Sequence, residues 1–237
     1  MKKRIWELDA LRGICVIGMV AVHLVYDLAV MYQVVDWNLP QWFHLLQQWG
    51  GVLFLLISGI SATLGSRSFR RGVVVFGCGM LITAVTVGMY LVKMANEAII
   101  IYFGVLHCLG VCMMLWPIFK KLPWRIYPLL GGVMIVVGLY FSMLPGIDSV
   151  WLMPLGLPWK NFATADYFPL LPNLGFFLLG AVLGRTVYKE KQSLLPRVNQ
   201  NAAPVRFLQW WGKNSLFIYL AHQPILAGFC MLLAALM

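Results

Sequence analysis

Residues 8–32 read LDALRGICVIGMVAVHLVYDLAVMY, a stretch that is long and apolar enough to cross a lipid bilayer as one helix. Besides Asp9 at its start, it contains the ionisable side chains of Arg12, His23 and Asp27. Arg12 and His23 are separated by about three helical turns and His23 and Asp27 by about one, so all three share one face of the helix. Because ionisable groups at membrane depth are costly, they mark a functional site more often than a scaffold. The alternative is that they pair with one another or with the backbone and lock a polar bundle interior.

The composition of the whole chain gives the fold class. Hydrophobic residues make up 61% of the 237 residues and charged residues 11%, and the mean hydropathy is +0.82. These values lie outside the range of soluble domains. We therefore expect an all-α, polytopic integral membrane bundle that forms a single domain over residues 1–237. Apolar runs of the required length predict about seven transmembrane helices, near residues 8–32, 43–64, 72–92, 98–118, 126–144, 168–188 and 212–236.

The positive charges are distributed according to these spans. The formal net charge is +10, a value that also suits nucleic-acid binding, but the cations gather in alternate connections. They are Lys2, Lys3 and Arg4 before the first span, Arg67, Arg70 and Arg71 after the second, Lys120, Lys121 and Arg125 after the fourth, and six more between residues 185 and 213. The positive-inside rule then places the N-terminus in the cytoplasm and the C-terminus outside. We expect a multi-pass protein of the cytoplasmic membrane, with a retained first helix and no nucleic-acid partner.

Two connections are long. Residues 145–167 are rich in Pro, Trp and Leu and nearly free of charge. Such a segment either folds back on the bundle as a lid or re-entrant piece, or forms an interfacial belt with Trp151 and Trp159. Residues 186–211 are basic and polar, and we interpret them as an ordinary cytoplasmic connector that is attracted to anionic lipid headgroups.

Two further histidines lie within predicted spans. His107 in the fourth span and His222 in the seventh are each about 14 Å deep, counted at 1.5 Å per residue. With His23 they can converge near mid-membrane, as ligand-binding groups or as hydrogen-bonded structural residues. Cys108 and Cys112 beside His107 offer too few ligands for zinc, so we expect packing and no metal. The five cysteines all fall within predicted spans and do not describe a disulfide framework.

Several polar and small residues have local roles that spacing suggests. Asp9 lies one turn before Arg12, which predicts an ion pair. Asp27 can orient the ring of His23 and steady its charged form. Asp166 precedes the sixth span, as a helix cap or a loop brace. Glycines in the third span can support close helix packing: Gly72, Gly77, Gly79 and Gly88.

The sequence resembles a known family. The run RIWELDALRGICVIGMVAVHLVYDL at 4–28 is similar to the opening of the heparan-alpha-glucosaminide N-acetyltransferase catalytic-domain family, which belongs with the acyltransferase-3 proteins. The spacing from Arg12 to His23 looks like the acyltransferase-3 signature. Four further stretches match in order: LFLLISGIS at 53–61, FGVLHCLGV at 103–111, DYFPLLPNLGFFLLGAVLGR at 166–185 and NSLFIYLAHQPIL at 214–226. Larger members of the family have a luminal N-terminal portion and further helices that we do not expect here, so we do not expect their glycosaminoglycan substrate to carry over.

The resemblance implies an enzyme that transfers an acetyl group from cytoplasmic acetyl-CoA to an amine or hydroxyl acceptor, often a sugar. The active-site histidine of the family maps onto His23, as a general base or as an acetyl carrier, and we add Asp27 as its catalytic partner. We expect the cofactor-binding residues to be Arg12, along the path of CoA, with His107, His222 and Arg71. A homodimer is also consistent with the resemblance.

Two other classes of protein compete with this hypothesis. A proton-coupled transporter would use His23, Asp27, His107 and His222 as a relay, but the sequence lacks the repeats and broken helices typical of transporters. A membrane scaffold without catalytic activity would explain the apolar composition but not the three ionisable residues on one helix face.

Overall fold

A computed structural model describes residues 5–236, so Lys2, Lys3 and Arg4 of the charge argument lie outside the described residues. Within this range the regular structure is helical, apart from two isolated bridges that pair Phe103 with Tyr167 and Ile147 with Trp159. The chain forms two compact units, Met1–Phe54 with Lys191–Met237 and Leu55–Glu190, whose border falls inside α2 (Gln41–Leu64). The organisation as a single domain over residues 1–237 stays a prediction.

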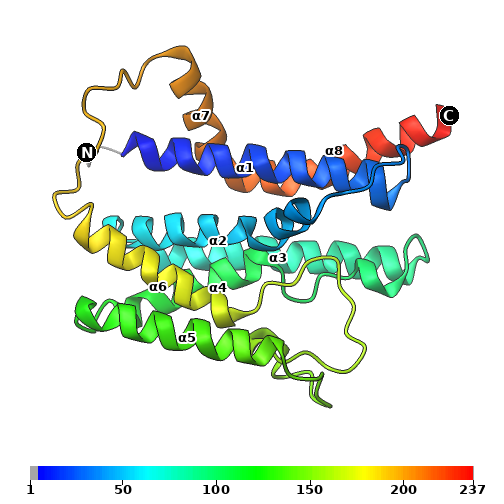
Figure 1. Ribbon diagram of the computed structural model, residues 1–237, viewed down its shortest axis with the longest axis horizontal. Helices are drawn as coiled ribbons and strands as arrows, with labels where there is room; N and C mark the ends of the chain where they lie inside the picture. Colours follow the sequence, from blue (N-terminus) through cyan, green and yellow to red (C-terminus); the bar gives the residue numbers. More distant parts are fainter. Residues whose placement is uncertain (1–4, 237) are drawn as a thin grey trace. The chain divides into compact units, whose positions relative to one another are not determined.

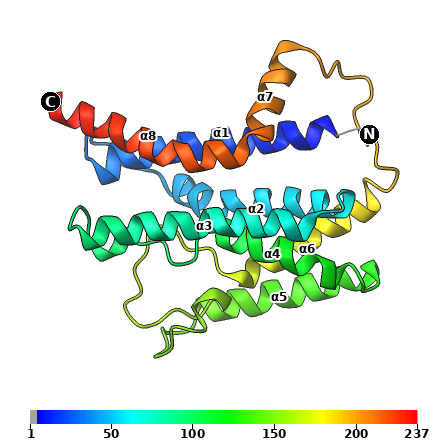
Figure 2. The same cartoon turned by 180° about the vertical axis from the view of Figure 1, so that it is seen from behind.

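The first unit contains the two helices that carry most of the candidate site. They are α1 (Trp6–Tyr26), which continues as a short π-helix η1 (Asp27–Met31), and α8 (Ser215–Leu236). In both views α1 and α8 run side by side (Figures 1 and 2). The third helix, α7 (Ala203–Lys213), stands at a steep angle to α1 in the same views. The sequence predicts only a connector over residues 186–211, whereas residues 203–211 belong to this helix, which has Pro204 in its first turn.

Two glycines let α7 approach α1 closely. A side chain at Gly13 of α1 would collide with the backbone of Leu208, and one at Gly212 of α7 would collide with the backbone of Asp9. Small residues at such crossings let backbones meet without a gap. The pair of glycines therefore fixes α7 against the first turns of α1.

The second unit is built from helix pairs. It contains α3 (Ser68–Leu91), α4 (Val105–Phe119), α5 (Tyr127–Ser142) and α6 (Leu170–Thr186), with short 3-10 turns η2 (Glu97–Ile99), η3 (Trp124–Ile126) and η4 (Met153–Leu155). Helix α3 packs on α4 and α5 on α6, and α4 also contacts α6 (Figure 1). The expected close packing of the third span is found at Gly72 and Gly79, which lie against α4, whereas Gly77 and Gly88 face open space.

The lengths of the helices confirm a multi-pass membrane protein in coarse terms. Among the described residues, five helices are long and apolar enough to cross a membrane: Trp6–Met31, Gln41–Leu64, Ser68–Leu91, Trp124–Ser142 and Ser215–Leu236. The predicted fourth and sixth spans contain the shorter helices α4, with 15 residues, and α6, with 17. Gly104 is extended directly before α4, and Leu171 has non-helical backbone angles near the start of α6. The count of seven spans and the orientation of the termini stay predictions.

The loop over residues 145–167 folds back on its own unit. The Tyr167 hydroxyl donates to the Met153 carbonyl at 2.6 Å, and the Thr164 hydroxyl donates to the Ile100 carbonyl at 2.6 Å. The Trp159 ring packs on Phe162, with ring centroids 4.5 Å apart. Trp151, in contrast, is 86% exposed. Of the two alternatives for this loop, folding back describes most of it, and an interfacial position suits Trp151.

Candidate functional site

The structure brings together two of the three histidines expected within the membrane. His23 of α1 and His222 of α8 have ring centroids 4.9 Å apart, with the ring planes tilted by 53°. His222 is 8% exposed, and His23 is half-buried. The expected convergence of histidines therefore holds for this pair.

Backbone carbonyls orient both imidazole rings. Nδ1 of His23 lies 3.0 Å from the Met19 carbonyl oxygen, and Nδ1 of His222 lies 2.6 Å from the Tyr219 carbonyl oxygen. Because a carbonyl oxygen only accepts, each neutral ring carries its proton on Nδ1 and keeps the lone pair of Nε2 for another donor. Both rings therefore have the tautomer in which Nε2 is the basic nitrogen.

Asp27 accepts a hydrogen bond from a residue outside the predicted site. Its side chain is buried, with 1% exposed, and its Oδ2 accepts a hydrogen bond of 2.9 Å from Nε2 of Gln223. Nδ1 of the His23 ring contacts the Met19 carbonyl oxygen, and the catalytic partnership of Asp27 with His23 stays a prediction. A polar amide side chain at position 223, next to His222 in a mostly apolar helix, is the sequence feature that could have predicted Gln223 as part of the site.

The helix changes type at Asp27. The Tyr32 amide donates to the Asp27 carbonyl at 2.9 Å, an i to i−5 hydrogen bond, and Asp27–Met31 form a π-helix. Segments of π-helix are rare and occur frequently at functional sites. The wider turn shifts the residues after Asp27 out of the register of α1.

Three hydrogen-bond acceptors at the site lack a donor within residues 5–236. They are Oδ1 of Asp27, Oε1 of Gln223 and Nε2 of His222, all buried. Buried polar atoms are normally satisfied, and leaving one unsatisfied costs about 1–3 kcal/mol. All three atoms accept rather than donate in the tautomer described above. The site therefore suits a bound group that brings its own N–H or O–H donors.

Arg12 occupies a different level of α1. Its Nη1 lies 3.0 Å from Oδ1 of Asp9, which confirms the ion pair predicted from their spacing. At 1.5 Å per residue, Arg12 is about 16 Å from His23 along the helix axis. Arg12 therefore lies at a different level of α1 from the imidazole pair, and its role in cofactor binding stays a prediction.

His107 belongs to the second unit and has local partners for both ring nitrogens. The Gly104 amide donates to its Nδ1 at 3.2 Å, and its Nε2 lies 3.2 Å from the Thr83 hydroxyl. The ring packs between Phe76 and Phe103, with centroids 5.5 and 5.6 Å away. This geometry favours the structural alternative, in which His107 secures the start of α4, and its role in cofactor binding stays a prediction.

Two further predicted residues also lie in the second unit. Oδ2 of Asp166 accepts a hydrogen bond of 3.0 Å from the Val105 amide. Asp166 lies in the loop that precedes α6, and this bond connects that loop to the start of α4. This confirms its expected role as a loop brace. Arg71 is exposed near the start of α3, with its guanidinium group close to Gly65 in the turn after α2. Its role in cofactor binding stays a prediction.

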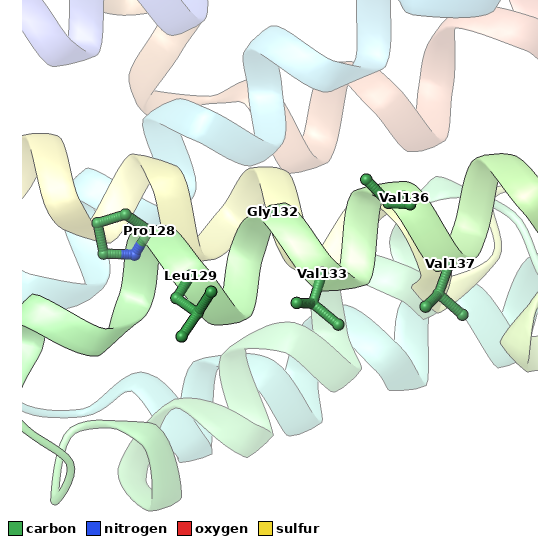
Figure 3. A pocket seen from close by; sticks show the side chains of 6 residues that line it. All are labelled: Pro128, Leu129, Gly132, Val133, Val136 and Val137. Atoms are coloured by element: carbon green, nitrogen blue, oxygen red, sulfur yellow. The ribbon is translucent and has the colours of Figure 1, made fainter.

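The second unit also has a pocket, on the surface of α5. Its volume is about 370 Å³, and its lining consists of Pro128, Leu129, Gly132, Val133, Val136 and Val137 (Figure 3). All six residues are apolar and belong to one helix, so the pocket offers neither a base nor a nucleophile. A furrow of this kind on an apolar helix suits lipid chains, and we do not place the chemistry there.

Comparison with known proteins gives the family. The model of the family described as "heparan-alpha-glucosaminide N-acetyltransferase, catalytic" matches residues 4–224. The chain belongs to this family. The match begins before α1 and ends at Pro224, so it includes His23, Asp27, His222 and Gln223. No curated protein and no solved structure matched the chain in the parallel comparisons.

Membership of the heparan-alpha-glucosaminide N-acetyltransferase catalytic family implies an enzyme of the N-acetyltransferase type. Together with the apolar helices, it points to a multi-pass membrane transferase. It gives no support to the alternative of a proton-coupled transporter.

Proposed function

We propose that the protein is an integral-membrane acetyltransferase that moves the acetyl group of cytoplasmic acetyl-CoA to an amine or hydroxyl acceptor, of sugar-like character, at or across the membrane. The observation that carries this proposal is the pair of imidazoles from His23 and His222, 4.9 Å apart inside the region that matches the family. Placement in the cytoplasmic membrane with the N-terminus inside is part of the proposal, as is a homodimer.

His23 supplies the basic nitrogen for the transfer. In one route, Nε2 of His23 takes the proton of the acceptor while the acceptor attacks the thioester carbonyl. The carbon–sulfur bond then breaks, and the CoA thiolate leaves and recovers that proton. In the other route, Nε2 attacks the carbonyl itself, the carbon–sulfur bond breaks, and the CoA thiolate leaves. The acceptor then attacks the acetyl group on Nε2, the carbon–nitrogen bond breaks, and the acceptor's proton goes to the CoA thiolate. The Nδ1 contact with Met19 supports both routes, because it leaves Nε2 available.

The acceptor end of the site is supplied by Asp27, Gln223 and His222. Their three unsatisfied acceptor atoms support a substrate rich in N–H and O–H groups. A sugar amine or hydroxyl has such donors, and each new hydrogen bond would remove a desolvation cost that the free protein bears. Asp27 thus holds the acceptor close to His23, one turn away on the same helix, rather than orienting the ring.

The CoA end of the site is assigned to arginines. Guanidinium groups pair with phosphate oxygens in a bidentate manner. Arg12, about 16 Å from His23 along α1, suits an extended arm that reaches from its level to the imidazoles. Arg71 is exposed and belongs to the other unit, and its role in binding CoA phosphates stays a prediction from the sequence. We leave His107 out, because both of its ring nitrogens have local partners.

The test is acetyl-CoA binding and turnover by the detergent-purified protein at several pH values through the histidine range. Wild type is compared with His23→Ala and with a matched control, His44→Ala, because His44 is an exposed histidine of α2. We expect His23→Ala to bind acetyl-CoA as wild type does and to lose turnover by about 10² to 10⁴-fold. His44→Ala keeps both properties.

Two outcomes would overturn the proposal. If folded wild-type protein does not bind acetyl-CoA, acetyl-CoA is not the acetyl donor. If His23→Ala keeps its turnover, His23 is neither the general base nor the acetyl carrier.

A further inference from the structure

The helix α7 differs in character from the helices that can cross a membrane. Its eleven residues, APVRFLQWWGK, extend about 16 Å, roughly half of the hydrocarbon thickness of a bilayer. Its sequence is the most amphipathic of the helices in the described part of the chain. A helix of this kind lies on a membrane surface rather than across it.

One face of α7 is occupied by α1. Leu208 and Gly212 are four residues apart and lie against Gly13 and Asp9 of α1. The segment before α7 is also held to α1, because the Leu194 amide donates to Oε1 of Glu7 at 2.8 Å. The position of α7 on α1 is therefore fixed by contacts within the helix and by one contact in the segment before it.

The other face of α7 is exposed and combines aromatic with basic side chains. Arg206, Phe207, Trp210 and Lys213 follow helical spacing, and all four are exposed, Phe207 by 55% and Trp210 by 57%. The positive charges come at the two ends of this row and the aromatic rings between them. Arg197 and the exposed Leu194 and Leu195 extend the same character into the preceding segment.

The angle between α7 and α1 places this row near the end of a membrane span. Trp6–Met31 is a candidate span of 26 residues, and α7 meets it in its first turns at a steep angle (Figures 1 and 2). If α1 crosses the bilayer, a helix steeply inclined to its start runs along the membrane surface. Aromatic rings are enriched at this level, and basic side chains there meet lipid phosphates.

We propose that α7 is an in-plane anchor that binds the headgroups of anionic phospholipids. Phe207 and Trp210 insert at the level of the headgroups, and Arg206 and Lys213 pair with lipid phosphate oxygens. Charge complementarity selects this partner, because residues 189–213 contain five cations and a single acidic side chain, Glu190. This inference does not depend on the acetyltransferase activity.

The test measures lipid binding to the full-length protein in detergent by native mass spectrometry. Phosphatidylglycerol is the anionic probe and phosphatidylcholine the neutral one. The variant is Arg206→Gln with Lys213→Gln, and the control is Lys93→Gln with Lys160→Gln, which removes the same charge from exposed cations outside α7. Thermal unfolding of each protein verifies that it is folded.

We expect wild type to bind phosphatidylglycerol more tightly than phosphatidylcholine, and to lose this preference in high salt. The α7 variant should bind phosphatidylglycerol about 10- to 30-fold more weakly, while the control changes by less than about twofold. Wild-type affinity in the folded α7 variant would overturn the proposal. Displacement of phosphatidylglycerol by free CoA would also overturn it, because the cations would then belong to the CoA site.

Discussion

The side-chain amide of Gln223 on α8 donates a hydrogen bond of 2.9 Å to the carboxylate of Asp27 at the end of α1, across 196 residues of sequence. It joins the two helices that carry His23 and His222. A buried carboxylate without a donor is costly, so this bond stabilises the fold. Because it connects α1 to α8, it also helps to hold the two imidazoles at their observed separation.

Replacing Gln223 by Met keeps the size of the side chain and removes the donor. We expect the free energy of unfolding to fall by about 1–3 kcal/mol, because the Asp27 carboxylate stays buried without a partner. Asp27→Asn should lose less, since its amide oxygen still accepts from Gln223. Unfolding of the purified variants in the same detergent measures both values. Equal stability of Gln223→Met and wild type would contradict the role of this bond.

His222→Gln tests whether the two imidazoles act as a unit. We expect turnover of acetyl-CoA to fall by about 10- to 100-fold, because the acceptor loses its hydrogen bond to Nε2 of His222, which is worth about 1–3 kcal/mol. The double variant with His23→Gln should be no slower than the slower single variant, because residues that act together have non-additive effects. Turnover by the four proteins gives the comparison. Losses that multiply would mean that the two rings act independently.

Gly212→Ala tests the contact between α7 and α1. The added methyl group meets the backbone of Asp9, so the helices must separate, and we expect a loss of about 1–3 kcal/mol in stability. The matched control is Gly18→Ala in α1, where a Cβ meets nothing within 4 Å. That change should be neutral or stabilising by up to about 1 kcal/mol, because alanine favours helix. Thermal unfolding distinguishes the two, and equal effects would show that the close contact is unimportant.

Tyr167 gives a prediction for alkaline pH. Burial raises the pKa of its phenol, whose hydroxyl donates to the Met153 carbonyl. A raised pKa in the folded state means that the stabilisation is fully present below the ordinary tyrosine pKa of about 10 and is lost as the pH rises above it. Tyr167→Phe should therefore be less stable than wild type at pH 8, with a smaller difference at pH 11. Unfolding at both values measures this, and a constant difference would contradict it.

Local spacing predicted the parts of the site that lie within one helix. The Asp9–Arg12 ion pair follows from their separation by one helical turn, and it is present. The same reasoning paired Asp27 with His23 and did not predict Gln223 as a hydrogen-bond donor to Asp27. A residue on the same helix was the obvious candidate, whereas the donor comes from α8.

Two helices begin later than the predicted spans, because hydropathy does not report where a helix begins. The fourth predicted span starts at residue 98 and α4 at Val105, after the extended Gly104; the sixth starts at residue 168 and α6 at Leu170, with a non-helical Leu171. The helix α7 was not predicted, because an amphipathic helix lacks the continuous apolar run that marks a membrane span.

The sequence by itself determined the helical membrane class, through its hydropathy, and the family, through the match over residues 4–224. It also placed Arg12, His23 and Asp27 on one helix face, because helical periodicity is a local property of the chain. Only the tertiary structure decided that His222 faces His23, that Gln223 binds Asp27 and that α7 lies against α1. These contacts depend on which helices pack together and at what rotation, which is set by side-chain packing between segments distant in sequence.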